Sequence, residues 1–111
     1  MLSEEQILNY MSIDKNDEIL FNEWAEMKKF LRRGSGRAVI VRKQNGKGIF
    51  CWQYDFTKSS FFPQQIGAGT EDMYSIMIKG CVVSFSWGRT YRFKFKSESK
   101  ANECWRILNN I

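Results

Sequence analysis

Residues 93–111, FKFKSESKANECWRILNNI, change their hydrophobic period halfway along. Phe93 and Phe95 alternate with lysines, which is the two-residue period of a β-strand with one buried face. From Ala101 to Leu108 the apolar residues recur at the three- and four-residue spacing of a helix. We therefore expect a strand that runs directly into a C-terminal helix, with Trp105 buried against the last two strands.

The size and composition indicate one globular domain without an enzymatic centre. The chain has 111 residues, 43% of them hydrophobic, which is enough for a modest core. It contains no histidine, so the commonest general base and metal ligand is absent. Cys51, Cys81 and Cys104 are scattered and form no C-x-x-C pair. We expect reduced, mostly buried thiols in a cytoplasmic protein, with no catalytic residues, no metal site and no cofactor.

Charge is divided unevenly along the chain. Residues 1–27 contain seven acidic residues and one basic residue, whereas residues 28–111 contain sixteen basic and five acidic residues. The sequence Ser3-x-x-Gln6 is a capping box that predicts a short first helix. We expect residues 1–33 to form a helical extension that packs on the rest of the domain, residues 36–111, and partly screens its basic surface.

A second helix is predicted from about Asp17 to Arg33. One helical stripe carries its large apolar residues, Leu20, Trp24, Met27 and Leu31. A basic cluster near its end either complements the helix dipole or extends a basic surface; it consists of Lys28, Lys29, Arg32 and Arg33.

Two hairpins organise the strands that follow. Asn45-Gly46 predicts a tight two-residue loop, which would pair Val41 with Phe50 and Val39 with Trp52. In the last hairpin, a three-residue loop at 88–90 would place the large apolar residues on one face. The predicted pairs are Trp87 with Tyr91, Phe85 with Phe93, and Val83 with Phe95. Weaker strands are expected at 59–62 and 73–78, separated by Pro63 and a loop at 67–69.

The expected class is α+β, mostly antiparallel β, with six or seven strands that curl to bury one apolar face. Residues 81–108, CVVSFSWGRTYRFKFKSESKANECWRIL, resemble the last two strands and C-terminal helix of a pleckstrin-homology (PH) domain. Tyr91, Phe93, Ser97 and Trp105 stand at the characteristic positions. Residues 21–41, FNEWAEMKKFLRRGSGRAVIV, are also similar to small apicomplexan PH-like proteins associated with membranes. The resemblance implies a curled sheet or barrel capped by the terminal helix.

The resemblance further implies a non-enzymatic adaptor that binds acidic phospholipid or a protein. PH lipid pockets typically use a Lys at the end of the first strand and a Lys/Arg-x-Arg pattern in the second. Lys43 and Lys47 fit, but Ile49 stands where an Arg is expected and the intervening turn is short. This departure favours charge-dependent contact with phosphatidic acid or a phosphoinositide over recognition of headgroup stereochemistry. The candidate lipid-binding residues, near hairpin tips, are Arg42, Lys43, Lys47, Lys58 and Arg89.

Other interpretations of the basic residues stay open. The outward face of the last strand is either a charged surface that discourages aggregation or a binding stripe; it comprises Thr90, Arg92, Lys94 and Lys96. A protein-interaction scaffold without lipid binding is the alternative function. A single-stranded nucleic-acid module is a third, although most aromatic residues are expected on the buried face. We expect a monomer in peripheral contact with a membrane. No segment is expected to span the bilayer, because no apolar run approaches the roughly 20 residues that this requires.

Overall fold

A computed structural model of the chain describes residues 13–29, 32–54 and 65–111. Seven strands form one antiparallel sheet in the order β4-β3-β2-β1-β7-β6-β5. No pairing in the described ranges joins β4 to β5, so the sheet is open there. The elements are β1 (Glu18–Lys29), β2 (Arg32–Arg42), β3 (Gly48–Tyr54), β4 (Gln65–Gly69), the 3-10 helix η1 (Thr70–Asp72), β5 (Tyr74–Lys79), β6 (Val82–Trp87), β7 (Arg89–Lys94) and α2 (Glu98–Asn110). The predicted class, α+β with mostly antiparallel strands and a C-terminal helix, is confirmed.

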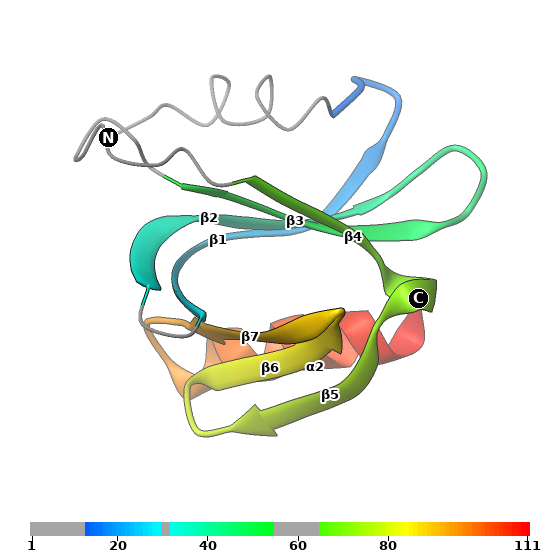
Figure 1. The fold of residues 1–111 in the computed structure, drawn as a ribbon. Helices are drawn as coiled ribbons and strands as arrows, with labels where there is room; N and C mark the ends of the chain where they lie inside the picture. Colours follow the sequence, from blue (N-terminus) through cyan, green and yellow to red (C-terminus); the bar gives the residue numbers. More distant parts are fainter. Residues whose placement is uncertain (1–12, 30–31, 55–64) are drawn as a thin grey trace.

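The sheet folds over into two layers because β1 and β2 bend. Figure 1 shows β1 to β4 in one layer and β5 to β7 in the other. β1 pairs with β2 along nearly its whole length, and its residues 26–28 also pair with β7. α2 packs against β5 and β6 and also contacts β1 and β2. The helix therefore holds the two layers together.

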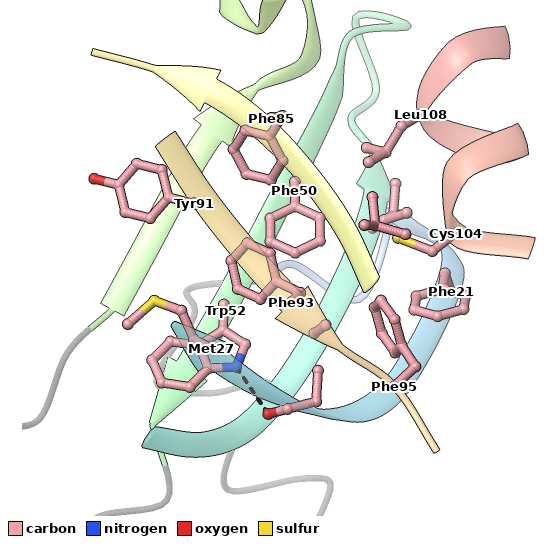
Figure 2. Close-up of a cluster of buried hydrophobic side chains, with 14 of the residues drawn as sticks. Phe21, Met27, Phe50, Trp52, Phe85, Tyr91, Phe93, Phe95, Cys104 and Leu108 are labelled. Atoms are coloured by element: carbon pink, nitrogen blue, oxygen red, sulfur yellow. Dashed lines mark hydrogen bonds between the residues drawn. The ribbon is translucent and has the colours of Figure 1, made fainter. Parts of the chain in front are cut away.

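Aromatic side chains from both layers fill the space between them. The Phe50 ring lies 5.2 Å from that of Phe85 and 4.7 Å from that of Phe93, measured between centroids. Trp52 is fully buried, and its indole N–H donates to the carbonyl of Ala25 at 3.4 Å (Figure 2). The core thus depends on residues of β3, β6 and β7 that are distant in sequence.

The C-terminal helix forms as its sequence predicts. Its cap is Ser97, whose side chain accepts a hydrogen bond from the backbone N–H of Lys100 at 3.2 Å. Cys104 and Leu108 point into the core, as Figure 2 shows. Trp105 is only half-buried, at the border of the core, and its indole N–H donates to the carbonyl of Ile76 at 3.4 Å. The expectation of mostly buried thiols is confirmed for Cys51 and Cys104, whereas Trp105 is only half-buried and not fully buried as expected.

The helix predicted from Asp17 to Arg33 is wrong, because β1 occupies residues 18–29. Ala25 and Met27 are buried while Glu26 and Lys28 are exposed, which is the alternation of a strand. β1 pairs with β2 along nearly its whole length and with β7 at residues 26–28. This pairing overrides the helical stripe in the sequence. The predicted short helix after Ser3 and the predicted strand at 59–62 lie outside the described residues.

The first hairpin differs from its predicted register by one residue. Val41 pairs with Ile49, and Ile40 pairs with Phe50. The backbone N–H of Lys43 donates to the carbonyl of Lys47 at 2.8 Å, so the loop has three residues, and of these only Gly46 has a positive φ, 84°. Both faces of this hairpin are apolar, because a second buried cluster consists of Val39, Val41 and Cys51. Hydrophobic alternation therefore could not distinguish the two registers.

The three-residue loop predicted at 88–90 is wrong, because Arg89 and Thr90 belong to β7. The last hairpin keeps the predicted faces with a register shifted by two residues. Phe85 pairs with Tyr91 and Val83 pairs with Phe93, around a turn at Gly88 with φ of 72°. A shift of two residues leaves every side chain on its predicted face.

The loop predicted at 67–69 is wrong, since these residues belong to β4 and pair with β3. The strand predicted at 73–78 is confirmed as β5.

Candidate functional site

Three of the five predicted lipid-binding residues lie together at the turn between β2 and β3. Arg42 ends β2, and Lys43 and Lys47 close the turn. This turn is near the start of β1, because Arg42 pairs with Glu18. Arg89 begins β7, which pairs with β1 near its other end, so strand pairing does not bring Arg89 to the turn. Lys58 lies outside the described residues.

Each basic residue of this turn has an acidic partner. Lys43 Nζ lies 2.7 Å from Asp17 Oδ2, and this hydrogen bond is the main cause that lowers the pKa of Asp17. The Asp17 side chain is only 4% exposed, whereas the Lys43 side chain is 30% exposed, so the pair is partly shielded from solvent. The other two pairs are Arg42 with Glu18 and Lys47 with Glu71, both at 3.3 Å. The ion pairs reduce the positive charge that the turn offers to an anionic ligand.

The Lys47–Glu71 pair stands at a hollow of about 210 Å³. Its lining residues are Gly46, Lys47, Gly48, Thr70, Glu71 and Ile111. Thr70 donates its hydroxyl to the carbonyl of Gly48 at 3.2 Å, which ties η1 to the hairpin. With one cation opposite one carboxylate, this hollow has no excess of positive charge.

A different surface carries basic residues that are not paired in this way. Residues directly opposite each other in an antiparallel pair point to the same face, so the register aligns side chains across four strands. One row runs Lys28, Arg92, Ser84, Met77, and the next runs Glu26, Lys94, Val82, Lys79. We call this surface, on the outside of β1, β7, β6 and β5, the basic sheet face; its cations are Lys28, Lys79, Arg92 and Lys94.

The cations of the basic sheet face are exposed and available. Within the described ranges, no carboxylate lies within 4.0 Å of the basic nitrogen of any of them, as it does for the turn residues. Lys28 and Arg92 are direct cross-strand partners, and like charges in such positions destabilise a sheet. A groove of about 270 Å³ runs over this face, lined by Glu26, Lys28, Val82, Arg92 and Lys94. Glu26 stands directly opposite Lys94, and this favourable pairing offsets part of the repulsion. With four cations and one carboxylate, the face can attract an anion.

Sequence alternation found only part of this surface. It placed Arg92 and Lys94 on the outward face of the last strand, and both are exposed there. The sequence left open that Lys28 extends a basic surface, but it assigned Lys28 to a helix, so the position of this residue opposite Arg92 was not predicted. Lys79 could have been found only from the pairing of β5 with β6, which places it opposite Val82.

The described residues were searched for two further kinds of feature, metal sites and membrane-spanning helices. Across 13–29, 32–54 and 65–111, no three His, Cys, Asp or Glu residues gather as a metal site. In the same part of the chain, no helix combines the length and apolarity needed to cross a membrane. Comparisons with protein-family models, with curated proteins and with solved structures found no match for this chain.

Proposed function

We propose that this protein is a non-enzymatic PH-like adaptor that binds acidic phospholipid at a membrane surface through the basic sheet face. The observation that carries the proposal is the contrast between two groups of cations. The cations of the β2–β3 turn are ion-paired. The four cations of the basic sheet face are exposed and have no such pairs among the described residues, and the only acidic residue in the two rows that define this face is Glu26. Seven antiparallel strands followed by a C-terminal helix support the PH resemblance.

The charge effect by itself supports a weak and reversible attachment to a membrane. A basic residue near an anionic membrane surface contributes about 1 kcal/mol. Four cations, offset in part by Glu26, therefore give a total of about 3 kcal/mol, which supports a reversible tether. The groove is shallow and its cations stand on flat strands, so binding should follow lipid charge more than headgroup shape. Because exposed charges are screened over about 8 Å at physiological ionic strength, affinity should fall as salt rises.

Co-sedimentation with vesicles tests this proposal. The wild-type protein should bind phosphatidylcholine vesicles that contain phosphatidylserine or phosphatidic acid, and should not bind pure phosphatidylcholine. The double substitution Arg92→Ala with Lys94→Ala should lose about 30-fold in affinity, from about 1 kcal/mol per cation. Arg42→Ala with Lys47→Ala is the matched control, since it removes the same charge from paired, exposed residues. It should lose less than about threefold, because the attraction fades within a Debye length of the surface.

Three results would contradict the proposal. A larger loss for the Arg42 and Lys47 variant would return the site to the β2–β3 turn, as the sequence predicts. If wild-type protein does not bind any acidic vesicle, the lipid function is wrong and a protein partner becomes the better hypothesis. Binding to any oligonucleotide that weakens linearly with the logarithm of salt concentration would instead indicate a nucleic-acid module.

A further inference from the structure

Two large apolar side chains are exposed beside the cations of the basic sheet face. Tyr74 is 58% exposed and Met77 is 62% exposed, and with Ile19 they are the exposed large hydrophobic residues of the described chain. Met77 pairs with Ser84, which pairs with Arg92, so all three point to one face. Tyr74 reaches the same face through Ser86. Two strand spacings, or about 10 Å, separate the Met77 position from that of Arg92.

A local irregularity of β5 puts both side chains on this face. In a regular strand, residues three positions apart point to opposite faces. Tyr74 and Met77 nevertheless pair with Ser86 and Ser84, which are two positions apart in β6. A bulge absorbs the additional residue, and Ser75 within it has φ of 54°, a conformation that few residues other than glycine adopt. Without the bulge, one of the two apolar side chains would turn away from the cations.

The bulge is fixed by the rest of the fold. The carbonyl of Ile76 accepts the indole N–H of Trp105 from α2 at 3.4 Å. Ile76 and Ile78 pack against the core from the other side of the strand. Tyr74 and Met77 are therefore exposed on a strand that is held in place by the core and by α2.

We infer that Tyr74 and Met77 enter the apolar layer of an anionic phospholipid bilayer while the four cations of the basic sheet face contact its phosphates. This inference rests on the proposed function and adds an orientation to it, with β5 as the inserted edge. We choose a bilayer as the partner because its negatively charged headgroups lie directly over an apolar layer. The headgroups match the cations, and the apolar layer matches the two exposed side chains. Tyrosine is suited to this boundary, because its ring is apolar and its hydroxyl is polar.

Salt dependence separates insertion from charge attraction. The probe is a phosphatidylcholine vesicle containing phosphatidylserine, with binding measured from low to high salt. Tyr74→Ser with Met77→Ser should lose affinity about tenfold, a small part of what burial of two large side chains can contribute. The loss should persist at high salt, where charge attraction is weak. Ile19→Ser is the matched control, because Ile19 is 41% exposed and lies opposite Val41, away from this face. It should bind as the wild type does.

Insertion depth provides the second readout. A polarity-sensitive thiol fluorophore at Met77→Cys, in a chain carrying Cys81→Ser, should shift to the blue when phosphatidylserine vesicles are added. The same fluorophore at Asn109→Cys, on the exposed side of α2, should not shift. Soluble glycerophosphoserine should not reproduce the shift, because it has no apolar layer.

The outcomes separate this inference from the proposed function. Normal vesicle binding by the Tyr74 and Met77 variant, without a fluorescence shift at residue 77, would overturn insertion while the proposed function stands. Absence of vesicle binding by the wild-type chain, with binding to polyglutamate in its place, would overturn both and identify an acidic protein surface as the partner.

Discussion

At the scale of single residues, burial decides which of the three cysteines can react. Cys51 is 7% and Cys104 is 1% exposed, and burial raises the pKa of the Cys51 thiol to about 11 and that of Cys104 to about 12. The thiolate is the reactive form, so both should be inert near neutral pH. Cys81 is half-exposed in the turn between β5 and β6. A chromogenic thiol reagent at pH 7.5 should detect one thiol in the native chain and three in denaturant. Rapid native reaction that survives Cys81→Ser would show that Cys51 or Cys104 is open to solvent.

At the scale of elements, close packing between strands depends on a glycine of β2. A Cβ added at Gly36 would lie 2.0 Å from the carbonyl oxygen of Gln53 and 2.9 Å from the Trp52 ring. Gly36→Ala should therefore destabilise the fold by about 1–3 kcal/mol, the usual cost of overpacking. Gly67 in β4 is the control, because a Cβ there meets nothing within 4 Å and its φ is not positive. Gly67→Ala should be neutral or stabilising by up to about 1 kcal/mol. Urea denaturation gives both values, and equal effects would contradict the packing argument.

The hairpins show which features of an element the sequence can predict. The turns at Asn45-Gly46 and Gly88 and the buried faces of β6 and β7 were found from turn residues and alternation. The register of the first hairpin was not predicted, because Val39 and Val41 are as buried as Ala38 and Ile40, so either register buries apolar residues. In the last hairpin a shift of two residues keeps the same faces, so alternation could not detect it. The β1 strand was missed because its sequence also fits a helical stripe. Pairing with β2 along nearly its whole length, and with β7 at residues 26–28, favours the strand.

At the scale of the whole molecule, the distribution of charge explains why the predicted site and the proposed site differ. The acidic first part of the chain supplies Asp17, Glu18 and Glu23. They pair with Lys43, Arg42 and Lys100, respectively. Partners this far apart in sequence are known only once the fold is known. The sequence therefore identified basic hairpin tips as candidates but could not show that their charges are balanced, or that Lys28 and Lys79 join Arg92 and Lys94.

We expect the domain to unfold cooperatively because of the position of α2. Its buried residue Leu108 is 3% exposed, and the helix contacts both β5 and β6 of one layer and β1 and β2 of the other. Leu108→Ala should cost about 2–5 kcal/mol, because it leaves a cavity where the two layers meet. Arg106→Ala, at an exposed position of the same helix, should change stability by less than about 0.5 kcal/mol. Urea unfolding of the Leu108 variant, followed by tryptophan fluorescence and by far-ultraviolet circular dichroism, should give coincident transitions at a lower midpoint. Loss of the helical signal before the fluorescence change would mean that α2 detaches from an otherwise stable sheet, and the helix would then be a peripheral cap that does not hold the layers together.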